Sequence, residues 1–69
     1  MKYLLTLPIS NTVNWKVYYY NSQIIIEEYE MDYDDGKFYL CHNKFYFSLE
    51  EVKNIIIGLG RVLKLLPLI

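Results

Sequence analysis

A turn signal between two apolar runs constrains this chain more than any other feature. Asp35-Gly36 tolerates the positive φ angles that a two-residue hairpin turn requires, and the segments on both sides are rich in strand-forming residues. Such a turn sets Asp34 opposite Lys37. Counting outward, the pairs are then Tyr33 with Phe38, Asp32 with Tyr39, Met31 with Leu40 and Glu30 with Cys41.

This pairing sorts the side chains onto two faces, because strand residues alternate from one face of a sheet to the other. The expected apolar face carries Tyr29, Met31, Tyr33, Phe38 and Leu40. The opposite face carries Glu30, Asp32, Asp34, Lys37, Tyr39 and Cys41.

Two further turns are predicted from the same reasoning. Asn21-Ser22 would pair Tyr19 with Ile24 and Val17 with Ile26, which places them on one face with Trp15. A turn at His42-Asn43 would join strands 37–41 and 44–47 and set Leu40 against Phe45. The buried positions change parity between Ile26 and Tyr29, so we expect a β-bulge or a sharp bend at Glu27-Glu28.

The C-terminal third predicts a helix over residues 49–66. Ser48 followed by Glu51 is a capping box, and Pro67 provides the stop. Gly58 and Gly60 indicate either a kink or a close approach of the helix to another backbone. The apolar residues alternate three and four apart and should lie on the apolar sheet face: Leu49, Val52, Ile56, Leu59, Leu63 and Leu66.

Together these elements predict one α+β domain over residues 1–69. We expect an antiparallel β-meander of four to five strands with one C-terminal α-helix packed on its inner face. The strands should cover residues 2–7, 14–20, 23–33, 37–41 and 44–47.

Charge is distributed unevenly along the chain. The net charge is only −1, but residues 27–35 hold six carboxylates and no base, whereas the flanking segments are basic. A general nucleic-acid binder usually shows a basic stripe, so this pattern argues against one.

The residues that could carry chemistry do not assemble into a site in the predicted fold. Cys41 and His42 are neighbours that point to opposite faces, and one Cys with one His cannot make a zinc site within one chain. Glu30, Asp32 and Asp34 share a face but do not fit the calcium-loop pattern. We therefore predict no catalytic residue, no metal site and no cofactor. We expect that the protein is not an enzyme.

The polar sheet face is instead predicted to bind a protein. Tyrosine buries a large area at little entropic cost, and same-face carboxylates recur about 6.5–7 Å apart, close to the spacing of phosphates along a nucleic-acid strand. The partner would be a host protein whose cleft normally holds nucleic acid. Stacking of the tyrosines on a single strand is the weaker alternative, because the carboxylates would repel phosphate. The expected contacts are Tyr18, Tyr20, Glu27, Glu30, Asp32, Asp34, Tyr39 and Tyr46.

Residue usage indicates an AT-rich reading frame, with no alanine and abundant Ile, Lys, Asn and Tyr. Such frames are typical of viruses and mobile elements. In size, composition and acidic face the chain resembles the small proteins with which phages and archaeal viruses block host enzymes, such as anti-CRISPR proteins and inhibitors of uracil-DNA glycosylase. The resemblance implies a host-defence inhibitor in the cytoplasm of the host cell, and no motif carries over functional residues.

The alternative is a structural or assembly protein that forms a homodimer or larger homo-oligomer. The C-terminal run has more apolar residues than one small sheet needs, and it is too short to span a bilayer. The expected oligomer contacts are Ile57, Leu66, Leu68 and Ile69.

Overall fold

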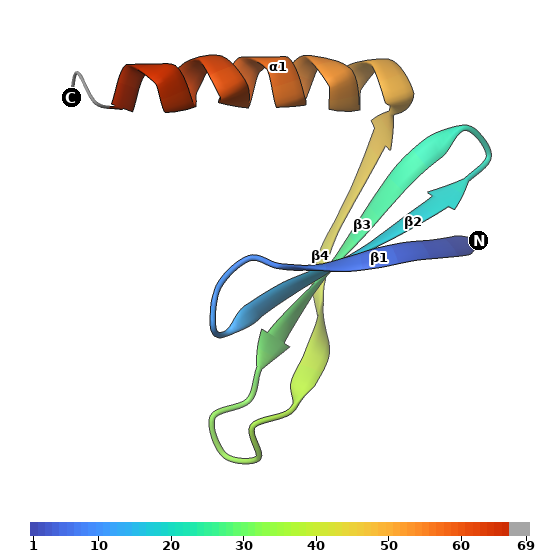
Figure 1. Ribbon diagram of the computed structural model, residues 1–69. Helices are drawn as coiled ribbons and strands as arrows, with labels where there is room; N and C mark the ends of the chain where they lie inside the picture. Colours follow the sequence, from blue (N-terminus) through green and yellow to red (C-terminus); the bar gives the residue numbers. More distant parts are fainter. Residues whose placement is uncertain (67–69) are drawn as a thin grey trace.

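The protein folds as an antiparallel sheet followed by one helix (Figure 1). The computed structural model describes residues 1–66. The strands are β1 (Lys2–Pro8), β2 (Val13–Tyr20), β3 (Gln23–Met31) and β4 (Phe38–Ser48), in the spatial order β1-β2-β3-β4, and the helix is α1 (Leu49–Leu65). The predicted α+β meander is therefore confirmed, with four strands.

The β2–β3 hairpin has the predicted turn and register. Asn21 and Ser22 have φ angles of 53° and 63°, the left-handed conformation that a two-residue hairpin turn needs. Val17 pairs with Ile26, and the ladder continues without interruption along β2. This hairpin forms the regular centre of the sheet.

The β3–β4 turn is longer than predicted. Asp32 donates its backbone N–H to the carbonyl of Lys37 at 2.8 Å, so the two-residue turn at Asp35-Gly36 is wrong. The Asp32 carboxylate accepts the N–H of Asp34, and the Asp35 carboxylate accepts the N–H of Lys37, both at 2.8 Å. These local bonds favour a wider turn, in which Gly36 has a φ of 70°. As a result Met31 pairs with Phe38, Glu30 with Tyr39 and Tyr29 with Leu40.

Strand β4 is continuous through residues 42 and 43, so the prediction of a hairpin turn at His42-Asn43 is wrong. Glu27 pairs with Lys44 and Tyr29 with Leu40, which leaves three β4 residues opposite Glu28 alone. The irregularity lies where the bulge was predicted, but β4 carries the extra residues. Strand β3 cannot carry them, because its ladder with β2 is continuous over the same residues.

The location of the bulge changes which residues share a face. Tyr29 lies with Lys16, whose Nζ is 4.4 Å from the centre of the Tyr29 ring, rather than with Trp15 as predicted. The far face, turned away from the helix, carries Tyr3, Lys16, Tyr18, Ile25, Glu27, Tyr29, Lys44 and Tyr46. The helix-side face carries Leu5, Leu7, Trp15, Val17, Ile24, Ile26, Glu28, Glu30, Phe45 and Phe47.

Little of the chain is buried. Among residues 1–66, Ile25 is the buried hydrophobic residue, at 4% exposed, and Glu27 is the buried charged one, at 8%. Both lie on the far face, which was predicted to be the solvent face. The residues predicted to form the core lie mostly half-buried or exposed on the helix-side face and near the β3–β4 turn.

The helix begins with the predicted capping box. The Ser48 side chain accepts the backbone N–H of Glu51 at 3.1 Å, and the Glu51 carboxylate accepts the backbone N–H of Ser48 at 2.8 Å. The helix then continues through Gly58 and Gly60, and at both glycines an added Cβ would meet nothing within 4 Å in the described chain. No helix within residues 1–66 is long and apolar enough to cross a membrane.

Candidate assembly surface

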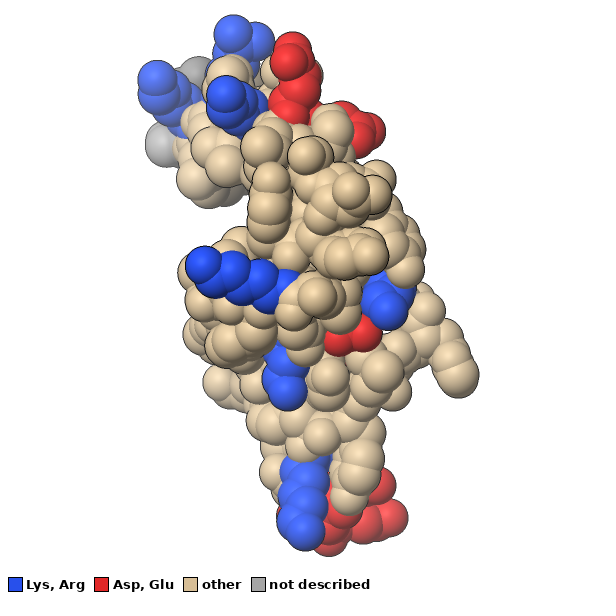
Figure 2. Space-filling model, turned by 90° about the vertical axis from the view of Figure 1, so that its right-hand side faces the viewer, with Lys and Arg blue, Asp and Glu red and all other residues tan. Residues whose placement is uncertain are grey.

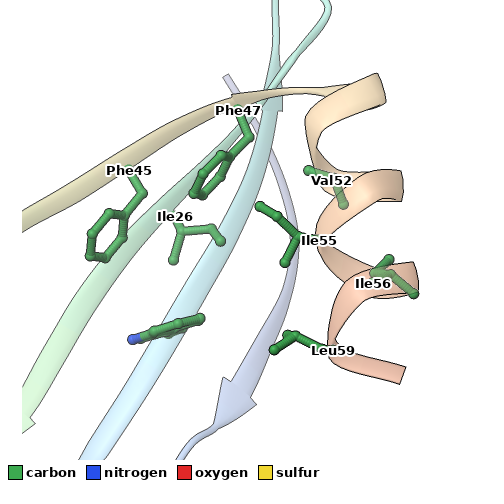
Figure 3. Close-up of a pocket in the computed structure, with 8 residues that line it drawn as sticks. Ile26, Phe45, Phe47, Val52, Ile55, Ile56 and Leu59 are labelled. Atoms are coloured by element: carbon green, nitrogen blue, oxygen red, sulfur yellow. The ribbon is translucent and has the colours of Figure 1, made fainter. Parts of the chain in front are cut away.

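The helix and the sheet form the two walls of an open apolar groove. Strand β4 leads into α1 at one corner of the sheet, and the helix then runs away from the strands at a steep angle (Figure 1). The groove has a volume of about 240 Å³, and Figure 3 shows Ile55 and Leu59 of the helix turned toward the sheet side chains across it. It is lined by Trp15, Ile26, Phe45 and Phe47 from the sheet and by Val52, Ile55, Ile56 and Leu59 from the helix.

Aromatic packing builds the sheet wall of the groove. The rings of Phe45 and Phe47 stack with their centroids 6.4 Å apart, and the Trp15 ring lies 5.9 Å from that of Phe45. The Trp15 indole N–H donates to the Glu28 carboxylate at 3.0 Å, which fixes the orientation of the ring. This wall is therefore preorganised, with apolar surface turned toward the helix.

The helix wall remains largely uncovered. Val52 is half-buried, whereas Ile56, Leu59 and Leu63 are 63%, 58% and 65% exposed. These residues belong to the predicted apolar stripe, which was expected to rest on the sheet. Only the first half of the helix lies over the sheet, so the prediction that the helix packs along the inner face holds only for that half (Figure 1).

The whole molecule has more surface than a folded monomer of its size. Its accessible area is 5702 Å², whereas the usual relation for an 8.3 kDa monomer gives about 4,600 Å². Its radius of gyration is 14.4 Å, against about 11 Å for a compact chain of this length. The difference of about 1,100 Å² is comparable to what one partner buries in a standard or somewhat larger interface.

The predicted oligomer contacts lie at different places relative to this surface. Leu66 is 51% exposed and continues the stripe, whereas Ile57, at 54% exposed, lies on the other side of the helix. Leu68 and Ile69 lie outside the described residues.

The predicted protein-binding residues do not share one face. Tyr18, Tyr20, Glu27 and Tyr46 belong to the far face, but Glu30 pairs with Tyr39 on the helix-side face. Asp32 and Asp34 lie at the β3–β4 turn, where the Asp32 carboxylate is already engaged by the Asp34 backbone. The wider turn and the β4 bulge separate residues that the predicted register brought together.

Part of the far face is occupied by its own ion pair. The Glu27 carboxylate lies 3.2 Å from Lys44 Nζ, which raises the pKa of Lys44 through this hydrogen bond and the surrounding charges. Burial, and then the charge of Glu27, raise the pKa of Tyr18 to about 12. Glu27 is therefore buried and offers little of the contact area predicted for it, whereas Tyr18 is half-buried.

The sheet gathers Glu28, Glu30 and Cys41 into a cluster, of which the sequence predicted the Glu30–Cys41 pair and not Glu28. Ligand atoms of Glu28, Glu30 and Cys41 lie within 4.8 Å of one another. Both Glu28 oxygens already accept hydrogen bonds, from Asn43 at 2.8 Å and from Trp15, and these bonds lower the pKa of Glu28. Burial and the charges of Glu30 and Glu28 raise the pKa of the Cys41 thiol, so the cluster disfavours a thiolate. The predicted register already set Glu30 opposite Cys41 on one face, but the bulge expected at Glu27-Glu28 hid that Glu28 shares this face.

Comparison of the chain with protein-family models, with curated proteins and with solved structures finds no match.

Proposed function

We propose that this protein is a homo-oligomeric assembly protein, whose chains associate through the apolar stripe of α1 and the groove beneath it. The observation that carries the proposal is the uncovered surface: the chain exposes about 1,100 Å² more than a compact monomer of its mass. The groove and the helix stripe contribute to this exposed surface through apolar side chains such as Ile56, Leu59 and Leu63. Large exposed apolar patches mark interaction sites.

A partner would also supply the stability that the single chain lacks. Only Ile25 is a buried hydrophobic residue within residues 1–66, and small domains with thin cores often depend on oligomerisation. Association would cover the helix stripe and the aromatic wall in one step. We therefore expect folding and assembly to be coupled.

A pair of matched variants tests the proposal. Leu59→Glu places a charge on the stripe, and Ile57→Glu places the same charge two residues away, at a similarly exposed position on the other side of the helix. We expect Leu59→Glu to reduce the native mass to that of a monomer, or to unfold the chain, at concentrations where wild type and Ile57→Glu remain oligomeric. Light scattering after size-exclusion chromatography measures the mass.

Two results would contradict the proposal. In one, wild type is monomeric over the whole concentration range. In the other, Leu59→Glu keeps the native mass of wild type. If Leu59→Glu fails to fold, Leu59→Ala provides the readout, because it should weaken association without burying a charge.

Inhibition of a host protein, the first function expected from the sequence, remains a prediction. The acidic surface that could serve it is smaller than the predicted binding face. Four acidic residues, Glu30, Asp32, Asp34 and Asp35, are gathered around the β3–β4 turn, and all are exposed. Reversal of Glu30, Asp32 and Asp34 to Lys should abolish capture of a basic partner from host lysate. Capture that survives this change would exclude the acidic turn as the binding surface.

A further inference from the structure

We propose that α1 of a second copy lies antiparallel to the first helix, stripe against stripe, and so covers the open side of the groove. The two-fold axis would cross the stripe midway between Ile56 and Leu59. This arrangement rests on the proposed function and specifies its geometry. The two helices would lie side by side, and the flank of each helix that carries Ile55 would stay turned toward its own sheet.

The spacing of the stripe supports a two-fold pairing. Its six residues are separated by three, four, three, four and three positions, a series that reads the same in both directions. The midpoint falls between residues 57 and 58. An antiparallel copy centred there sets every stripe residue against another, as knobs do in antiparallel coiled coils. The pairs are Leu49 with the second copy's Leu66, Val52 with its Leu63 and Ile56 with its Leu59.

The charges on the helix favour the antiparallel orientation. Glu50 and Glu51 occupy the first turn, whereas Arg61 and Lys64 lie near the other end. Figure 2 shows both acidic and basic side chains on the helix, and a second acidic group at the opposite end of the molecule. A parallel pair would place like charges together, whereas an antiparallel pair sets the acidic end of each helix beside the basic end of the other.

The residues on the two sides of the stripe also favour the antiparallel orientation. Ile55 and Val62 extend the stripe on one side, and Ile55 lines the groove. Lys53 and Gly60 lie on the other side. In an antiparallel pair the apolar flanks of the two helices adjoin each other, over the aromatic sheet wall. In a parallel pair each apolar flank would meet the flank that carries Lys53.

The amount of uncovered surface agrees with two copies. The stripe extends about 26 Å along the helix, and the sheet of the same chain lies under only its first half. This pairing covers the second half of both helices and closes the open side of both grooves. Because the contact is isologous, it closes at two subunits, and the excess of about 1,100 Å² per chain is sufficient for a stable dimer.

Disulfide trapping tests the arrangement, with Cys41→Ser as the background in every variant. Val52→Cys and Leu63→Cys are prepared separately and then unfolded, mixed and refolded together before oxidation. The two positions are about 16 Å apart along one helix, whereas a disulfide needs Cα atoms about 4.4–6.8 Å apart, so they cannot join within a chain. We expect a cross-linked dimer from the mixture and none from either variant alone.

The matched control is the pair Asn54→Cys and Arg61→Cys. These positions are symmetric about the same midpoint but lie on the polar side of the helix, so their mixture should remain unlinked. The native mass of each mixture is measured before oxidation, to check that the substituted chains still associate.

The outcomes separate the arrangement from the proposed function. Self-linking of Val52→Cys alone would indicate a parallel pair and would overturn the arrangement. A native dimer that gives no Val52–Leu63 cross-link would also overturn it, while leaving the assembly function intact. A monomeric wild-type chain would contradict both the antiparallel arrangement and the assembly function.

Discussion

Glu27 and Ile25 are the two best-protected residues of the chain, and both lie on the face that was predicted to meet solvent. Their neighbours explain the protection. Ile25 lies between Tyr18 and Tyr46 in the ladder, and Glu27 lies between Lys16 and Lys44. Long side chains cover the shorter ones through their apolar stems and rings, so a face that looks polar in the sequence contains the driest positions in the structure.

Removal of the counter-charge of Glu27 should destabilise the fold. Lys44→Met leaves the Glu27 carboxylate, which is 10% exposed, without its partner at 3.2 Å. We expect a measurable loss in the free energy of unfolding, smaller than for a fully buried pair because Lys44 is 41% exposed. Urea denaturation at fixed protein concentration measures it. Lys37→Met, at the exposed β3–β4 turn, should change the value little; equal effects of the two variants would contradict this role of Lys44.

Tyr18 should make the fold sensitive to alkaline pH. Burial and the charge of Glu27 raise its pKa from 10.0 to about 12. The stabilisation from this shift is complete below pH 10, because both states are then protonated, and is lost as pH rises through about 12. The melting temperature of wild type should therefore fall more steeply above pH 10 than that of Tyr18→Phe. Parallel curves for the two proteins would show that Tyr18 does not contribute.

At the scale of elements, the features that depend on adjacent residues were predictable. The Asn21-Ser22 turn and the Ser48 capping box are confirmed because each is decided by a few neighbouring side chains. The prediction of a two-residue β3–β4 turn was wrong because two aspartate side chains accept hydrogen bonds from the backbone within the turn. The bulge was assigned to the wrong strand because its place depends on the β2–β3 ladder, which a local pattern cannot reveal.

The capping box should account for part of the stability of α1. Ser48→Ala removes the acceptor for the Glu51 N–H and should cost about 1 kcal/mol, whereas Ser48→Asp retains an acceptor and should cost less. Thermal unfolding followed by circular dichroism compares them. The pKa of Glu51 is lowered chiefly by its bond to the Ser48 backbone, which all three proteins keep, so the stability of all three should fall as acid protonates Glu51. Equal stability of wild type and Ser48→Ala at neutral pH would contradict this account.

In the candidate site, too, the features set by neighbouring residues were predictable, and those set by the packing of distant segments were not. The apolar stripe of the helix follows from residue spacing, and its residues lie where the spacing placed them relative to one another. The groove could not be predicted, because it arises from the angle at which the helix leaves β4. The predicted binding face was divided for a related reason: its two halves are joined across the bulge.

At the scale of the whole molecule, the chain is an open shape with apolar surfaces on the inside of the opening. The sheet wall faces the side of the helix that carries Ile55 and Leu59, yet the helix extends beyond the sheet and leaves its second half uncovered (Figures 1 and 3). A second copy of the same shape can cover both surfaces. The central claim is therefore that the functional unit contains more than one chain.

Sedimentation equilibrium of the wild-type protein, over a wide range of concentrations, tests this claim most directly. We predict a mass of twice 8.3 kDa at high concentration, with a decrease toward the monomer on dilution that is accompanied by loss of the circular dichroism signal of the fold. A folded species of 8.3 kDa that persists at the highest concentration would contradict the account.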